Sequence, residues 1–301
     1  FKEFDMLEQL LGSGGFVAKY LPNSGPGNKT LLAGDEQLGF FGEVTSVQLI
    51  DSGELELWLG ISGGTVVTAT GLVWLKFIRK GKVIYYAKTH VRSALPWNTL
   101  YLAGAVYGER GPGYNSGANP PTDQLKTKVI QEGDREWMVK ARLPRGYNTD
   151  PFVGPGTSHP EAVIGSEWED LMNRVVSGGH LYHDLWAKYT LTGLTLNGPW
   201  TLVAETMEAD VLKVGMRGGG SITASGSSTR TNTSTGLAWR PVLELVNQAD
   251  YVFDADQMTG ELQSPLIEPQ GITATFDLVV SPEEVAYGME LQTTTMTFTT
   301  V

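Results

Sequence analysis

The sequence predicts an α+β fold that is mostly β, with short strands, many turns and few helices. Its 37 glycines and 15 prolines interrupt the chain often, and such punctuation is typical of short strands joined by turns. Two segments, 74–88 and 127–144, have the residue pattern and the central turn of β-hairpins. Only one segment, which begins at Ser166, has the spacing of a clear amphipathic helix.

We expect three parts along the chain. Residues 1–28 form an N-terminal arm, in which 1–12 make a short docking helix and 13–28, rich in Gly, Pro, Ser and Asn, make a linker or arm. Residues 29–246 form a central α+β domain, and 247–301 form a small β-rich C-terminal tail. The division predicts that both ends dock on neighbouring copies.

The first half of the central domain begins with the apolar segments 29–35 and 38–44, after which Ser46 is expected to cap a short helix that runs to Asp51. The strongest hairpin follows at 74–88, with its turn at Lys80-Gly81. Its strands mix aromatic and branched residues with cations, so we expect an antiparallel pair with one face in solvent and the cations on that face.

The next segments alternate regular structure with loops. Residues 95–100 open a brief helix that Gly104 ends. The turn-rich loop 108–122 is the first place to expect an exposed contact surface. A second hairpin, over 127–144, turns at Glu132-Gly133-Asp134, and the loop 145–164 leads to the central helix.

The central helix has a start signal, an apolar stripe and a stop signal. Ser166 and Glu169 have the spacing of a capping box, in which a hydroxyl and a carboxylate satisfy the free amides of the first turn. Gly178-Gly179 ends the helix. Five residues recur at helical spacing and are expected to pack into the core: Trp168, Leu171, Met172, Val175 and Val176.

The rest of the central domain predicts a tightly packed frame. Gly218–Gly220 allow the backbone to pass close to another element, and 221–235 reads as an exposed loop or an irregular hairpin. Pro241 favours an extended chain before a buried strand at 242–246. We expect two basic residues of this region, Arg217 and Arg240, to hold carboxylates or carbonyls, with Glu205 and Glu244 as candidates.

The tail after residue 246 predicts strands at 273–280 and 291–301. The second of these is rich in threonine and ends the given sequence. We expect it to pair either with its own sheet or with a neighbouring subunit.

Composition excludes several classes of function. The net charge of −11 and the pI of about 4.9 leave no basic face for nucleic acid. There are no cysteines, hence no disulfides, thiolate metal sites or cysteine nucleophiles. No run of about eighteen apolar residues occurs, so no membrane span is expected. The run Arg217-Gly218-Gly219-Gly220 lacks the lysine and the spacing of a phosphate-binding P-loop.

Two clusters of polar residues are weighed as sites. His180 and His183, followed by Asp184, have a spacing that ligates metal on a helix, against the alternative of a capped or exposed helix end. Glu167, Glu169 and Asp170 include the carboxylates that a general acid and base would need. Since Glu169 already has a capping role and further metal ligands are lacking, we expect no catalytic, cofactor-binding or metal residues.

The order of five segments resembles a family of virion structural proteins of tailed bacteriophages. These segments are 29–44, the hairpin that begins at Trp74, 97–108, the Gly-Ser-Glu-Trp helix and 239–245. The resemblance covers roughly residues 29–246. It implies a virion location, homo-oligomers and contacts with other virion proteins.

A second set of short motifs lies inside the same region, in the order Arg142-Leu143-Pro144, Glu167-Trp168-Glu169, Trp200, Glu205, Met216-Arg217-Gly218-Gly219 and Trp239-Arg240-Pro241-Val242. This order resembles that of formylglycine-generating and other C-type-lectin-like domains. That fold is an irregular α+β unit that displays variable loops on a fixed frame, and phages use it for receptor binding. The oxidase members need cysteines, so their activity is not implied; the sugar-binding strings Glu-Pro-Asn and Trp-Asn-Asp are also missing.

The leading hypothesis is therefore a non-enzymatic structural component of a phage virion, in the tail, collar, fibre or decoration. The alternative is an adhesion protein that binds a host receptor or glycan through the loops 108–122, 145–164 and 221–235. A third hypothesis, an enzyme acting on a cell-surface polymer, would use Glu167 or Glu169. The residues expected to hold the frame are Ser166, Trp168, Glu169, Trp200, Arg217, Trp239 and Arg240.

Overall fold

The computed structural model describes most of the predicted central domain. The chain divides into two compact units, Phe1–Tyr251 and Val252–Val301, and every described residue belongs to the first. The predicted helix at 1–12 and the predicted tail at 247–301 lie outside the described residues. The structure describes residues 19–114, 119–155, 158–175, 186, 197–219, 221 and 223–246.

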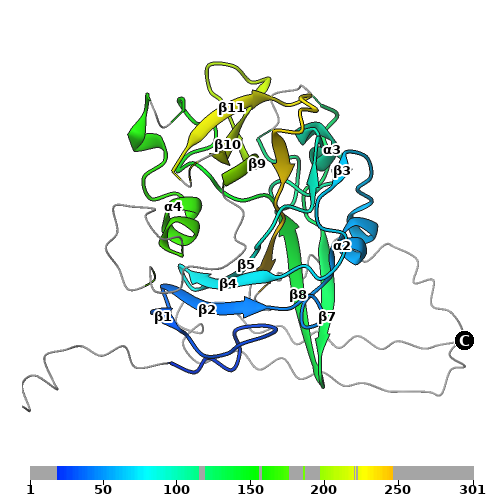
Figure 1. Ribbon diagram of the computed structural model, residues 1–301, viewed down its shortest axis with the longest axis vertical. Coiled ribbons are helices and arrows are strands. Elements are labelled where there is room, and N and C mark those ends of the chain that lie inside the picture. Colours follow the sequence, from blue (N-terminus) through cyan, green and yellow to red (C-terminus); the bar gives the residue numbers. More distant parts are fainter. Residues whose placement is uncertain are drawn as a thin grey trace, which may run out of the picture. The chain divides into compact units, whose positions relative to one another are not determined.

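The larger sheet has seven strands in the order β1-β2-β4-β5-β13-β8-β7, and every neighbouring pair is antiparallel (Figure 1). Both predicted hairpins belong to it, as β4–β5 and β7–β8. The mostly β prediction is thus confirmed. The strands are β1 Ala33–Gly34, β2 Leu38–Val44, β4 Trp74–Arg79, β5 Lys82–Ala87, β7 Thr127–Glu132, β8 Arg135–Arg142 and β13 Val242–Leu245.

The smaller sheet has six strands in the order β11-β10-β9-β12-β6-β3. Its one parallel pair among the described strands joins β12 to β9. The predicted irregular hairpin at 221–235 contributes β11, which pairs with β10. The strands are β3 Thr65–Val66, β6 Arg92–Ser93, β9 Asn197–Thr206, β10 Lys213–Gly219, β11 Ser225–Thr229 and β12 Leu237–Trp239.

One continuous segment, residues 237–245, supplies an interior strand to each sheet. Its first part, β12, lies between β9 and β6, and its second part, β13, lies between β5 and β8. Between them, Pro241 has no N–H to donate, and its carbonyl accepts from Ala87 N at 3.0 Å. The predicted buried strand is therefore present, and it joins the two sheets through the polypeptide itself.

The first hairpin turns as predicted, but it has no face in solvent. Lys80 and Gly81 have φ angles of 51° and 74°, as a two-residue turn between twisted strands requires. On β5, however, Tyr85 packs into the core cluster on one face of the sheet, and Tyr86 packs into the cluster on the other. The helix α4 (Glu167–Leu171) lies over β4 (Figure 1) and helps to cover this second face. The expectation of one wet face is wrong because both faces are covered.

The same covering buries a cation that was expected in solvent. Lys76 on β4 is fully buried. Its Nζ lies within hydrogen-bond distance of three oxygens, Ser24 Oγ at 3.1 Å, Gly25 O at 3.1 Å and Asn28 O at 2.6 Å. Residues 19–28, the described part of the predicted linker, therefore pack against the sheet and supply acceptors for the buried amino group.

Three short α-helices are described: α2 Ser52–Leu59, α3 Trp97–Leu102 and α4. The predicted brief helix near residue 97 is α3, followed by Gly104 at a φ of 72°. The helix predicted from Ser46 to Asp51 is wrong. Thr45 and Gln48 close a single turn there, and α2 begins only after Asp51, whose carboxylate accepts from Ser52 N at 2.8 Å.

Candidate functional site

The start of α4 forms one of the two hydrogen bonds of the predicted capping box. Ser166 is the N-cap, and its hydroxyl accepts from Glu169 N at 3.3 Å. The reciprocal bond is not formed, because Ser166 N donates to Val163 O at 3.1 Å. The Glu169 carboxylate instead accepts from Arg217 and Asn173.

The α-helix is shorter than predicted: it passes into a 3₁₀ turn, η2 Met172–Arg174. Residues 176–185, which follow Val175, lie outside the described part of the chain. The apolar stripe itself is as predicted over its described members, which are fully buried: Trp168, Leu171, Met172 and Val175.

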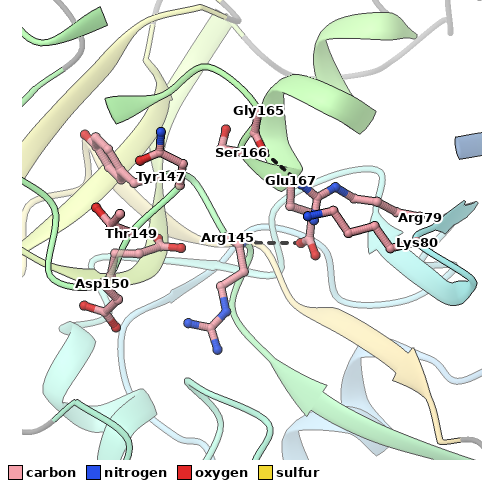
Figure 2. A pocket seen from close by; sticks show the side chains of 11 residues that line it. Arg79, Lys80, Arg145, Tyr147, Thr149, Asp150, Gly165, Ser166 and Glu167 are labelled. Carbon is pink, nitrogen blue, oxygen red and sulfur yellow. Dashed lines mark hydrogen bonds between the residues drawn. The ribbon is translucent and has the colours of Figure 1, made fainter. Parts of the chain in front are cut away.

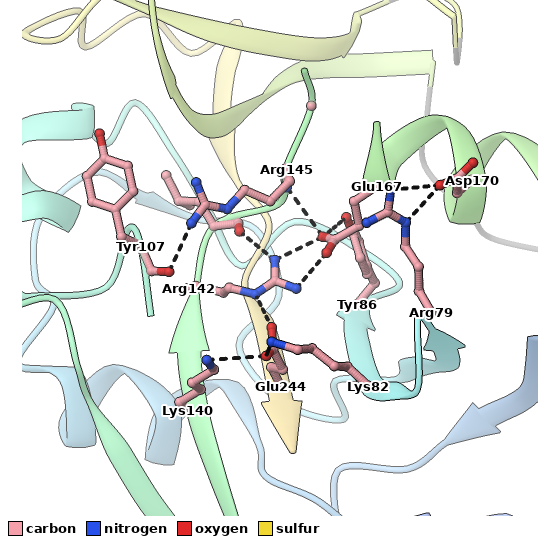
Figure 3. A network of polar contacts seen from close by, with 12 residues as sticks. Arg79, Lys82, Tyr86, Tyr107, Lys140, Arg142, Arg145, Glu167, Asp170 and Glu244 are labelled. Atoms are coloured by element: carbon pink, nitrogen blue, oxygen red, sulfur yellow. Dashed lines mark hydrogen bonds and ion pairs between the residues drawn. The ribbon is translucent and has the colours of Figure 1, made fainter. Parts of the chain in front are cut away.

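A buried ion-pair network ties α4 to the centre of the larger sheet (Figure 3). Arg142, at the end of β8, donates through Nη1 and Nη2 to the Glu167 carboxylate at 2.9 and 2.6 Å. Its Nε donates to Glu244 Oε2 on β13 at 2.9 Å. Arg145 N also points to Glu167 at 3.3 Å. One guanidinium thus holds two carboxylates from two elements.

The network keeps both carboxylates ionised. Burial raises the pKa of Glu167, but Arg142 and its hydrogen bonds outweigh burial, and the pKa lies below its usual value. Burial also raises the pKa of Glu244, but the charges of Arg142, Lys140 and Lys82 outweigh burial and lower the pKa to about 2. Lys140 and Lys82 lie 3.2 and 3.4 Å from Glu244 Oε1.

The two arginines singled out in the sequence both act as ties, with partners other than those named. Arg217 on β10 is fully buried and pairs with Glu169, not with Glu205. Arg240 donates to the carbonyls of Ala87 and Lys88, each at 2.6 Å, and not to Glu244. These partners lie far away in sequence, and no local pattern indicates them.

The glycines of β10 allow the close approach that was expected. A Cβ on Gly219 would lie 2.2 Å from the ring of Trp200, and one on Gly218 would lie 3.0 Å from the ring of Trp168. Trp200 is half-buried on β9, while Trp239 on β12 is buried in the larger core cluster. Gly220 lies outside the described residues.

A polar hollow of about 220 Å³ opens where α4, the β4–β5 turn and the loop after β8 meet (Figure 2). Arg79 and Lys80 come from the turn, and Figure 2 shows them on the side opposite Tyr147 and Asp150. Glu205 from β9 contributes a carboxyl group that is almost completely buried. The hollow therefore combines the exposed cation of Lys80 with the carboxyl group of Glu205, which is held away from solvent.

Burial keeps two acidic groups of this hollow, Glu205 and Asp150, from ionising readily. It raises the pKa of Glu205 to about 8; Arg145 opposes this shift and Asp150 adds to it. Glu205 Oε2 accepts from Gly146 N at 3.1 Å. Burial also raises the pKa of Asp150, against hydrogen bonds from Thr206 N and Oγ1. A carboxyl group with a pKa near 8 is protonated at neutral pH and can donate a hydrogen bond.

A second hollow, of about 270 Å³, adjoins the first. The two share four lining residues: Arg79, Lys80, Arg145 and Glu167. Sequence reasoning placed Arg145 and Asp150 only within a loop and did not identify them as site residues. Their sole sequence signal is the Leu-Pro-Arg-Gly stretch that leaves the hairpin.

The carboxylates weighed as an acid and base pair are each engaged by an arginine. Glu167 holds Arg142, Glu169 holds Arg217, and Asp170 accepts from Arg79 Nε at 2.8 Å. No two of these three carboxylates lie free in the same hollow, where they could act as an acid and base pair.

The sequence candidate for metal, at His180 and His183, lies outside the described residues. Within the described ranges, no cluster of three or more His, Asp or Glu side chains has an arrangement that would hold a metal ion. The helices described here are all too short or too polar to cross a membrane.

Comparisons with family models, with curated proteins and with solved structures found no match to this chain. The geometry of the described residues is therefore the basis for the proposals that follow.

Proposed function

We propose that the chain is a non-enzymatic structural component of a tailed-phage virion, which assembles with neighbouring copies through an open sheet edge. The observation that carries the proposal is β7, the last strand of the seven-stranded sheet. An edge strand presents unpaired backbone groups that a strand from another chain can bind.

The register shows which groups β7 presents. Ala141 N donates to Lys126 O at 3.0 Å, and in an antiparallel pair the inward and outward residues alternate. Hence Thr127, Val129 and Gln131 direct their N–H and C=O groups outward, and none of these backbone groups has a partner among the described residues. Three alternating residues are enough to pair with a short strand.

The edge adjoins a shallow groove of about 510 Å³, which is formed by β7, the turn before α2 and the first turn of α2, and whose lining mixes apolar and polar side chains. Two exposed apolar side chains line it, Val47 at 94% and Val129 at 47% exposure. Exposed apolar side chains beside an open strand edge are typical of a docking surface. Lys128 and Glu54, which pair at 3.0 Å, also line the groove.

We assign this edge to a second copy of the chain. The sequence continues beyond residue 246, and 291–301 is predicted to form a strand. That segment has no charged residue and carries Leu291, Met296 and Phe298, which can pack against the exposed Val47 and Val129 of the groove. Strand addition from copy to copy builds an oligomer of the kind that virion components form.

A C-type-lectin-like arrangement of residues 29–246 is part of the same proposal. The ties of Arg142, Arg217 and Arg240 support it, since they hold a fixed frame from which loops extend. A second candidate function, adhesion to a host receptor or glycan, is favoured by one observation: the two polar hollows lie at the loop that begins with Arg145.

The test compares Val129→Lys with Val153→Lys, because Val153 is 44% exposed but lies outside the groove. A lysine on the open edge opposes strand addition. We expect Val129→Lys, or deletion of 291–301, to give monomers in sedimentation velocity, and Val153→Lys to leave the oligomer intact. A monomeric parent chain, or an unchanged oligomer in both test variants, would overturn the proposal.

The virion location has its own test, immunogold labelling of purified particles with an antibody to the chain. Label around the head or neck supports a collar or decoration role, and label at the distal tail supports adhesion. Absence of label from the particles contradicts the virion assignment, whatever the oligomeric state.

A further inference from the structure

The hollow between β5, β8 and the Arg145 loop is basic, although the protein as a whole carries a net charge of −11. Its three carboxylates are Glu109, Glu167 and Glu244. Twice as many cations line it: Arg79, Lys80, Lys82, Lys140, Arg142 and Arg145.

Internal pairing leaves two of these cations available. Arg142 is occupied by Glu167 and Glu244, and Lys82 and Lys140 also pair with Glu244. Arg79 pairs with Asp170 just outside the hollow. Among the described residues, the side chains of Lys80 and Arg145 have no carboxylate within ion-pair distance. Both also line the adjoining polar hollow, so they stand at the boundary that the two hollows share.

The backbone of Lys80 and the side chain of Arg145 are held in defined positions. Lys80 occupies the tight β4–β5 turn, and its N–H donates to Gln37 O at 2.6 Å. Arg145 lies 5.4 Å from the centre of the Tyr107 ring, and its Nη2 donates to Tyr107 O at 3.2 Å (Figure 3). This leaves further N–H groups of the guanidinium for a ligand, because an arginine has five donors.

We propose that this basic hollow binds the oxyanionic group, a carboxylate, phosphate or sulfate, of a ligand that extends into solvent. Guanidinium and ammonium donors recognise such oxyanions through charge-assisted hydrogen bonds. The volume of about 270 Å³ suits one small group rather than a whole oligomer. The binding energy is electrostatic at an open surface, so affinity falls as ionic strength rises.

The test uses three probes: inorganic phosphate, D-glucuronate and D-glucose. Glucuronate and glucose differ at one position of the ring, where the first carries a carboxylate. We expect calorimetric or NMR titration at low salt to detect phosphate, glucuronate or both, and not glucose. Binding of phosphate alone identifies a phosphate source, and binding of glucuronate alone identifies an acidic sugar.

Variants locate the site. Lys80→Asn removes one cation and keeps a residue that tolerates the positive φ of 51°; Arg145→Gln removes the other. Each is expected to weaken binding roughly tenfold, the effect of losing one charge-assisted hydrogen bond. The control Lys213→Asn removes the same charge from β10, away from both hollows.

Two results would overturn the inference: no binding of either anion to the parent chain, or equal weakening by Lys213→Asn. Lys80→Asn should leave oligomerisation unchanged, since Lys80 lies outside the β7 groove. A failure of strand addition and a failure of anion binding would thus give different results.

Discussion

Replacing Arg142 by methionine should be among the most destabilising single changes in the central domain. The side chain is buried, and its loss leaves the buried Glu167 without its cation and Glu244 with only Lys140 and Lys82. Breaking a buried ion pair by removing one partner costs about 3–5 kcal/mol, because the remaining charge is desolvated and uncompensated.

The pKa of Glu244 gives a second value for the free energy that this network contributes to folding. Its pKa falls from the usual 4.5 to about 2 in the folded chain, which corresponds to about 3 kcal/mol of stability. Because the folded pKa is the lower one, this stability is present above pH 4.5 and is lost as the pH falls toward 2. Arg142→Met should abolish most of that acid-dependent loss.

Urea unfolding followed by tryptophan fluorescence, at pH 7 and at several lower values, measures both effects. Lys82→Met is the matched control, since Lys82 also approaches Glu244 but is 53% exposed at its side chain; an exposed pair contributes about 1 kcal/mol or less. Equal losses in the two variants, or an Arg142→Met loss below about 1 kcal/mol, would refute the reasoning.

Three further predictions concern single side chains. Glu205 has a folded pKa of about 8, so its stabilising contribution is present below its unfolded pKa and is lost as the pH rises through 8. Glu205→Gln should therefore be more stable than the parent chain at pH 9, as measured by thermal unfolding. Gly219→Ala should cost about 1–3 kcal/mol by overpacking against Trp200, whereas Gly53→Ala, on open helix surface, should gain about 0.5–1 kcal/mol. Lys76 has a folded pKa of about 6, so the parent chain should lose stability relative to Lys76→Met as the pH falls from 10 to 6. A difference in unfolding free energy that stays constant over this range in urea titrations would contradict this.

The features that sequence predicts well here are those set by neighbouring residues. The Ser166 cap, the Lys80-Gly81 turn and the stop near Gly104 each depend on a few consecutive side chains. The polar ties could not be predicted in this way. Arg142 meets Glu244 across 102 residues, and Lys76 meets Ser24 across 52.

Apart from the loop 145–164, the residues of the candidate site were not predicted, for the same reason. Its hollows gather a hairpin turn, a loop, a helix start and residues of several strands from distant parts of the chain. Each cation there is an ordinary surface residue by sequence, and only the pairing of its neighbours leaves Lys80 and Arg145 available. Burial of Glu205 likewise depends on the packing of the Gly146 loop against β9.

The segment 237–245 also sets an order on biosynthesis. Because β12 and β13 are interior strands of the two sheets, a nascent chain that ends before residue 237 lacks the central partner of both. The hairpins β4–β5 and β7–β8 can form early, but they have no strand between them until β13 emerges. Completion of both sheets therefore waits for the same nine-residue stretch to leave the ribosome. A translational stop before it would leave both sheets incomplete.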